Sequence, residues 1–262
     1  MTDISVIVVN FNRDENLRLC LWGLEQQDKE YELIVTDDGS RDQSVPIAMA
    51  SQATVLWHPH NDRRTAAARW RGAQVATGEL LVFIDSDVVL APWALSTYWN
   101  AYRRIPDRAL GGYCKHLPGL LIAEPDWHRL WTCDYPTRHI DQGSIVVGKD
   151  PREAVGQMHF FADPDQLWER PLSLVSGNMA IPWHVYDAAG GWDRDMVGRG
   201  QDGEFSIRVA KAGYPFSYLI DAPAVHLAHE RKETRGDSYA YIRAKHADCY
   251  DGDKFMWPPR KD

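Results

Sequence analysis

Two aspartates separated by one residue, Asp85 and Asp87, come at the end of an apolar stretch that has the length of a buried strand. Side chains alternate along extended backbone, so both carboxylates are expected to point to the same side. Like charges held this close repel each other unless a cation lies between or near them, and oxygen ligands favour Mg²⁺ or Mn²⁺. The spacing therefore predicts a divalent metal site. The alternative is a turn that caps a helix, because aspartate is common at both positions.

A second acidic cluster, Asp37-Asp38-Gly39-Ser40, also follows an apolar stretch. A carboxylate at this position can accept hydrogen bonds from a ring N–H of a nucleotide base or from a ribose hydroxyl. Taken alone, the four residues are simply a favourable turn sequence. A turn does not require acidic groups at successive strand ends, so the recurrence with Asp85 and Asp87 favours a binding function.

A third acidic residue, Asp202, lies just before a predicted helix at 204–212. The partial positive charge at a helix N-terminus stabilises the ionised form of a carboxyl group, and a general base must be ionised to accept a proton. Asp202 is therefore a candidate general base. The alternative is a helix N-cap with no catalytic role.

The elements that must position these groups alternate between strand and helix over residues 1–90. Short apolar strands separated by helices predict a parallel sheet that is covered on both faces. Ligands of such sheets bind beyond the carboxyl ends of the strands, where the acidic clusters and the polar segment 10–13 would meet. We predict strands at 4–9, 33–36, 54–57 and 80–84, and helices at 14–26, 43–51 and 64–76.

Patterning is less regular after Pro92. Residues 111–165 are rich in Gly, Pro, Asp, His and Trp and are interpreted as loops over the sheet edge, whereas the tail from Glu230 is charged and is expected to be mobile or wrapped over the site. The remaining predictions are a helix at 93–104, regular structure at 174–181, a helix after Pro182, the helix at 204–212 and a last strand at 216–220.

Composition excludes several classes of protein. The 262 residues are enough for one large α/β unit, and no apolar run approaches the roughly 20 residues of a membrane span. No secretory signal is visible at the N-terminus, so we expect a cytoplasmic protein, with a peripheral membrane role still open. The net charge of −8 argues against nonspecific nucleic-acid binding. The cysteines (Cys20, Cys114, Cys133 and Cys249) show no CxxC pair, which favours thiols over disulfides or zinc.

Five segments occur in an order that resembles the family 2 glycosyltransferases of GT-A fold, in particular the branch similar to β-1,4-galactosyltransferases and chondroitin-polymerase modules. They read ISVIVVNFNR, LIVTDDGSRD, RTAAARWRGAQVATGELLVFIDSD, SGNMAI and GGWDRDMVGRGQDGEFSIRVAKAG. The resemblance spans residues 4–229. It implies a mostly parallel, Rossmann-like central sheet flanked by helices and fused to an acceptor-binding half. The expected divisions are a single catalytic domain at 1–230, with a nucleotide-binding half at 1–90 and an acceptor-binding and catalytic half at 91–230, and a tail at 231–262.

The resemblance also implies a role for individual residues of the nucleotide site. Asp38 would contact the base, Asp85 the ribose or a metal-bound water, and Asp87 the metal itself. Phe11 matches an aromatic residue that stacks on the base in similar enzymes, although core packing would explain it equally well. The nucleotide-sugar site as a whole would comprise Val9, Phe11, Arg13, Asp38, Asn61, Arg69, Asp85 and Ser86.

The remaining implied roles concern the metal, the base and the acceptor. Similar enzymes place a histidine of the metal shell after the last strand, where this chain has His226 and His229, and His226 fits better. Asp202 matches the second acid of the family's Gly-rich loop, which is the catalytic base. Gln201 replaces the usual first acid and is left with an acceptor-binding role. Among the tryptophans of the second half, Trp192 is the best candidate for an acceptor contact, with Asp193 beside it.

The expected function is inverting, metal-dependent transfer of a hexose or N-acetylhexosamine from a nucleoside diphosphate sugar, with UDP favoured by the resemblance. The acceptor hydroxyl would belong to a saccharide, a lipid-linked intermediate or a small molecule, and the metal would be Mn²⁺ or Mg²⁺. Two alternatives are a sugar-phosphate nucleotidylyltransferase and a carbohydrate- or nucleotide-binding module without turnover. The first favours a basic Gly-rich loop after its first strand, where this chain has Asn10-Phe11-Asn12-Arg13.

Overall fold

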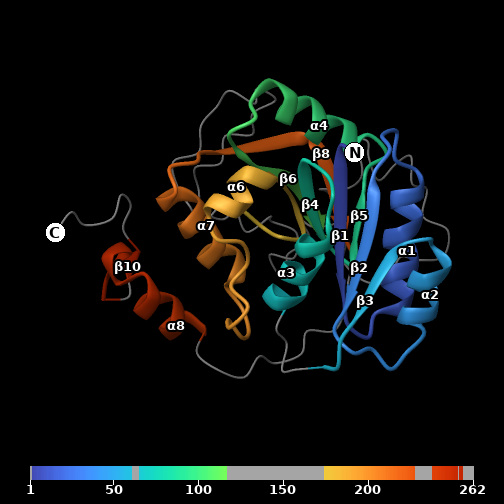
Figure 1. Cartoon of the computed structure of the whole chain (residues 1–262), viewed down its shortest axis with the longest axis horizontal. Helices are drawn as coiled ribbons and strands as arrows, with labels where there is room; N and C mark the ends of the chain where they lie inside the picture. The colour runs from blue at the N-terminus through green and yellow to red at the C-terminus, as the bar shows by residue number, and fades with distance from the viewer. Residues whose placement is uncertain (1, 61–64, 117–173, 228–237, 253, 256–262) are drawn as a thin grey trace, which may run out of the picture.

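The computed structural model describes residues 2–60, 65–116, 174–227, 238–252 and 254–255, and its centre is one mixed sheet with helices on both faces (Figure 1). The strand order is β3-β2-β1-β4-β7-β6-β8-β5. The pairs β1–β2, β1–β4, β2–β3 and β6–β8 are parallel, and the pairs that involve β7 or β5 are antiparallel. Its strands are β1 (Ile4–Asn10), β2 (Glu32–Asp37), β3 (Thr54–Trp57), β4 (Leu80–Asp85), β5 (Val88–Leu90), β6 (Ala109–His116), β7 (Asn178–Pro182) and β8 (Phe216–His226).

The helices alternate with the strands in the first half of the chain. A short unit of one helix, a 3₁₀ turn and two small strands follows at the C-terminal end. Every strand and helix predicted for residues 1–90 is confirmed, with ends that agree within one residue. The helices are α1 (Asp14–Glu25), α2 (Ser44–Ala50), α3 (Thr65–Val75), α4 (Ala94–Arg104), α6 (Trp183–Ala188), α7 (Gln201–Lys211) and α8 (Ser238–Lys245), followed by the 3₁₀ turn η2 (Ala247–Cys249) and the small pair β9 (Tyr250–Asp251) and β10 (Lys254–Phe255).

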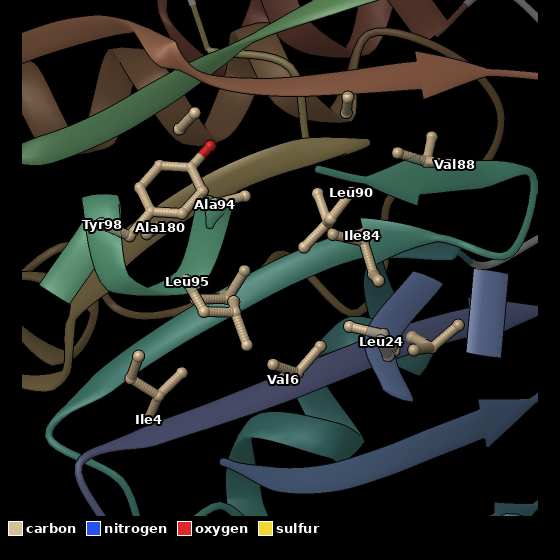
Figure 2. Packing of buried hydrophobic residues seen from close by; sticks show 14 of the residues in the cluster. Ile4, Val6, Leu24, Ile84, Val88, Leu90, Ala94, Leu95, Tyr98 and Ala180 are labelled. Atoms are coloured by element: carbon tan, nitrogen blue, oxygen red, sulfur yellow. The ribbon is translucent and has the colours of Figure 1, made fainter. Parts of the chain in front are cut away.

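Apolar side chains fill both faces of the sheet, because alternate residues of the central strands point in opposite directions. On β1, Val6 and Val8 pack beneath α1, α2 and α4, whereas Ile7 packs beneath α3, α6 and α7. Figure 2 shows the first of these layers, in which Leu24 of α1 and Tyr98 of α4 approach the strands. This arrangement is the three-layer α/β architecture predicted from the sequence.

Three predictions for the second half of the chain need correction. Residues 111–116, interpreted as loop, belong to β6. The last strand continues beyond residue 220 as far as His226, so that histidine lies in β8 and not after it. Residues 238–245 of the tail form α8, and the rest of the interpreted loop (117–165) lies outside the described residues. In the part of the chain that is described, no helix has both the length and the apolar character needed to cross a membrane.

Candidate active site

The turn after β2 is fixed by Asp37, the neighbour of the residue that the resemblance assigned to the nucleotide base. Asp37 accepts hydrogen bonds from the backbone N–H groups of Gly39 and Ser40, from the Ser40 hydroxyl and from the Asn10 amide. All acceptor positions of Asp37 are therefore used within the protein. The turn packs closely against His60 and needs a glycine at position 39, because a Cβ atom at Gly39 (φ +82°) would lie 2.3 Å from the backbone nitrogen of His60. Asp37 holds the turn and leaves Asp38 as the candidate ligand.

Asp38 lies beside a pair of stacked rings. Its Oδ2 atom is 3.0 Å from Nδ1 of His60, and the His60 ring stacks on Phe11 with a centroid distance of 4.1 Å. Burial raises the pKa of Asp38, and the neighbouring His60 partly opposes this shift. The structure thus brings Asp38 and Phe11 together as predicted and adds His60. His60 had no distinguishing signal in the sequence beyond its position three residues after β3.

Asp85, the last residue of β4, is joined to the start of α7 through a buried arginine. Arg69 of α3 donates from Nη2 to Asp85 at 2.6 Å and from Nη1 to the side-chain oxygen of Gln201 at 3.0 Å. Only 4% of Arg69 is exposed. Burial raises the pKa of Asp85, with further contributions from the negative charges of Asp87 and Asp202, although Arg69 lowers it. Arg69 therefore connects the end of β4 to the helix that carries Asp202.

Asp87 and His226 meet because β5 pairs with β8. Val88 is opposite His226 in this antiparallel pair, and the Leu227 N–H donates to the carbonyl of Asp87 at 2.7 Å. The His226 Nε2 atom lies 3.6 Å from Oδ1 of Asp87. The structure thus brings together two of the predicted metal ligands.

The acidic residues at this rim supply few protein ligands for a metal. Within the described ranges, no three His, Cys, Asp or Glu side chains form a group that could hold a metal ion, and His229 lies outside them. A carboxylate and an imidazole still fit a cation that takes its other ligands from substrate phosphates and water, as Mg²⁺ commonly does. Asp87 and His226 are therefore the residues that would hold a Mn²⁺ or Mg²⁺ ion at this rim.

Asp202 lies in the first turn of α7 and is half-buried. The helix begins at Gln201, three residues earlier than predicted, and its N-cap is Gly200 in the left-handed conformation without a side-chain capping bond. This excludes the alternative in which Asp202 is the N-cap. The negative charge of Asp202 contributes to the raised pKa of Asp85, so the two carboxylates lie close enough to interact electrostatically.

Gln201 and Trp192, two of the predicted acceptor contacts, have structural roles instead. The Gln201 amide donates to the carbonyl of Gly198 at 2.7 Å and accepts from Arg69, so its polar atoms are engaged. Trp192 is 2% exposed, stacks on Phe205 at 4.3 Å and meets the edge of Phe83. The prediction that Trp192 contacts an acceptor is wrong, because a ring that is only 2% exposed has no free face for a sugar to stack on.

Asp193, the third predicted acceptor contact, binds the C-terminal helix. Its Oδ2 atom accepts from the Tyr241 hydroxyl and from the Lys245 ammonium, each at 2.6 Å. Although burial opposes ionisation, these hydrogen bonds lower the pKa of Asp193. Its carboxylate is therefore an anchor for α8. Of the remaining predicted nucleotide-site residues, Val9 and Ser86 are buried at the rim, Arg13 is half-buried just before α1, and Asn61 lies outside the described residues.

Replacing Trp192 with phenylalanine tests this correction. We expect the variant to lose roughly 1–3 kcal/mol of unfolding free energy, as for other large-to-small core changes, because part of the space between Phe83 and Phe205 is left empty. The acceptor KM should stay unchanged. Urea unfolding and acceptor-dependent kinetics would measure the two effects. A raised acceptor KM with unchanged stability would restore Trp192 as an acceptor contact.

Known glycosyltransferases resemble this chain in sequence. Residues 5–118 match the family model described as "Glycosyl transferase family 2". The validoxylamine A glucosyltransferase of Streptomyces hygroscopicus subsp. limoneus is 25% identical over 87% of this chain and 52% of its own length. The uncharacterized glycosyltransferase YfnE of Bacillus subtilis (strain 168) is 24% identical over 86% of this chain and 64% of its own. The chain thus spans only about half to two thirds of the length of these relatives.

A solved structure shows the same fold. The structure of S. aureus TarS residues 1–349 in complex with UDP-GlcNAc superposes with a TM-score of 0.60 and 15% identity, and the match covers 88% of this chain and 60% of that one. The N-terminal half of the sheet, its acidic rim and the family match over residues 5–118 lead to one assignment. Residues 5–118 match the family 2 glycosyltransferases, and the chain has the fold of the GT-A glycosyltransferases.

Proposed function

We propose that the chain transfers a hexose or N-acetylhexosamine from a nucleoside diphosphate sugar, with UDP as the nucleotide, to a hydroxyl acceptor with inversion at the anomeric carbon. One observation carries the proposal: four aspartates from three separate stretches of the chain (Asp38, Asp85 with Asp87, and Asp202) lie at one edge of the sheet, and two of them raise the pKa of a third. A structural explanation does not require this concentration of negative charge. A nucleotide site bridged by a cation does.

The donor would lie along the rim from Asp38 to Asp87. Asp38 can accept a hydrogen bond from the base, and the stacked rings of Phe11 and His60 supply aromatic surface beside it. Arg69 holds the Asp85 carboxylate in place at the sugar and phosphate end of the site. Support for UDP comes from TarS, a protein of the same fold that has been solved with UDP and with UDP-GlcNAc.

In the proposed reaction, Asp202 lies on the acceptor side of the anomeric carbon and acts as the general base. Asp202 accepts the proton of the acceptor hydroxyl while the acceptor oxygen forms its bond to the anomeric carbon. The bond from that carbon to the diphosphate oxygen breaks on the opposite face, which inverts the configuration. A Mn²⁺ or Mg²⁺ ion held by Asp87 and His226 would supply positive charge to the leaving diphosphate. The acceptor class stays open among saccharides, lipid-linked intermediates and small molecules.

Calorimetric titration with UDP and with GDP, each with Mn²⁺ and with EDTA, tests the donor assignment. We expect UDP to bind with an affinity that rises when Mn²⁺ is present, because the cation offsets repulsion between the diphosphate and the acidic rim. GDP should bind more weakly. No heat of binding with either nucleotide would contradict a nucleoside diphosphate donor, and tighter binding of GDP would reassign the nucleotide.

A further inference from the structure

The C-terminal helix α8 packs directly against the segment that leads to Asp202. Ile242 of α8 belongs to an apolar cluster with Met196 and Ile207. A Cβ atom at Gly200 would lie 2.9 Å from Cδ1 of Ile242, so the backbone of this segment approaches α8 as closely as a glycine permits. Figure 1 shows α8 beside the lower part of the chain that enters α7. The position of Asp202 therefore depends on a helix that lies far away in the sequence.

One side chain of α8 contacts both ends of this segment. The Lys245 ammonium lies 2.6 Å from Oδ2 of Asp193 and 2.8 Å from Oε1 of Glu204. Asp193 and Glu204 bound residues 193–204, which include the left-handed glycines Gly198 and Gly200 and the proposed base. A single cation thus joins the start of the segment to the first turn of α7.

Both carboxylates are committed to this contact. Glu204 is 1% exposed and also binds Arg208 at 2.7 Å and His246 at 3.2 Å. Burial alone would disfavour its ionised form, but the hydrogen bonds from His246, Arg208 and Lys245 lower the pKa of Glu204 strongly. At Asp193, the only other side-chain donor among the described contacts is Tyr241. Loss of Lys245 would leave Glu204 with its other partners, and Asp193 with one side-chain donor, Tyr241, beside the backbone N–H of Asp195.

We propose that Lys245 is a positioning residue that closes the segment 193–204 and so fixes Asp202 for proton transfer. It acts through Asp193 and Glu204 and does not touch the substrate. The kinetic part of the proposal rests on the proposed function, whereas the closure of the segment does not. A misplacement of about 1 Å in a reacting group can cost on the order of 100-fold in rate, so a loosened segment would have a large effect.

The test compares Lys245→Met with Lys211→Met in the full chain. Lys211 is the control: its side chain is 29% exposed against 31% for Lys245, and it binds Asp248 at 2.7 Å and the His246 ring at 3.3 Å across the same interface. Among the described contacts it makes none directly with residues 193–204. Amide hydrogen exchange of peptides covering 193–204 is the readout that needs no activity. We expect exchange there to rise on the order of tenfold in Lys245→Met and to stay unchanged in Lys211→Met and in β1 peptides.

Kinetics supply the second readout. With a UDP-sugar donor, we expect kcat to fall on the order of tenfold to 100-fold in Lys245→Met, with an unchanged Kd for UDP, and Lys245→Arg should restore most of it. Unchanged exchange in residues 193–204 would overturn the proposal. Faster exchange that is confined to the α8 peptides would also overturn it. If the wild type bound UDP but transferred nothing, the proposed function would fail while raised exchange would still support the closure.

Discussion

Sugar transfer is expected to fall by about 10²–10⁴-fold when Asp202 is replaced with asparagine, while UDP binding is retained, because the amide has the shape of the carboxylate but cannot accept the acceptor proton. Asp202 is half-buried in the first turn of α7, and Gly200 occupies the capping position. The substitution therefore removes no capping bond. Steady-state transfer with a UDP-sugar and calorimetry with UDP would measure the two effects separately.

The matched control is Asp195→Asn, an exposed carboxylate in the segment that precedes the same helix. Its rate should stay within about twofold of the wild type, since surface changes of this kind have small effects. Normal transfer by Asp202→Asn would refute its role as the base. If the chain were a binding module without turnover, the wild type would show no transfer, so neither Asp202→Asn nor Asp195→Asn would change a measurable rate.

The nucleotide half could be predicted closely because its signals are local. Strands β1, β2 and β4 are apolar runs of strand length, and Asp37 and Asp85 end two of them. The rim followed from the rule that parallel strands present their carboxyl ends together. Residue types alone did not separate the roles of Asp37 and Asp38, and only the resemblance selected Asp38, because the choice depends on hydrogen bonds from Asn10, which is on another strand.

The second half was less predictable because its determinants are tertiary. Gly111-Gly112 suggested a loop, yet the backbone of β6 needs a glycine there: a Cβ atom at Gly112 would lie 2.2 Å from the Tyr98 hydroxyl and 2.4 Å from the Asn178 amide. Trp192 follows two turn-forming glycines and reads as an exposed ring, whereas Phe83 of β4 and Phe205 of α7 enclose it. No local pattern contains those contacts.

The link between α8 and the site is of the same kind. Asp193 was predicted to bind an acceptor because it follows Trp192 and has an available carboxylate. Its actual partners, Tyr241 and Lys245, are far away in the sequence and lie in a tail that carries many charges. Charge composition cannot show which of those lysines is paired, whereas the packing of Ile242 on Gly200 decides it.

Asp87→Ala should abolish the metal-dependent part of UDP affinity. Loss of an outer-shell partner already costs about 10–100-fold in metal affinity, so loss of a direct carboxylate ligand is expected to cost at least about 100-fold. In titrations, the Kd for UDP with Mn²⁺ should become equal to the Kd with EDTA. His226→Ala should weaken the Mn²⁺ effect without removing it, because the neutral imidazole contributes no charge to the attraction.

The control for this experiment is Asp28→Ala, since Asp28 is an exposed carboxylate just before β2, at the opposite end of the sheet from Asp87. It changes the net charge by the same amount, so it separates a local ligand effect from a general change in the protein's field. If Asp28→Ala left the Mn²⁺ effect intact and Asp87→Ala removed it, the cation would be placed at the β5–β8 pair. Metal-dependent affinity that survived in Asp87→Ala would show that Asp87 is not a ligand, and the paired carboxylates would then need another explanation.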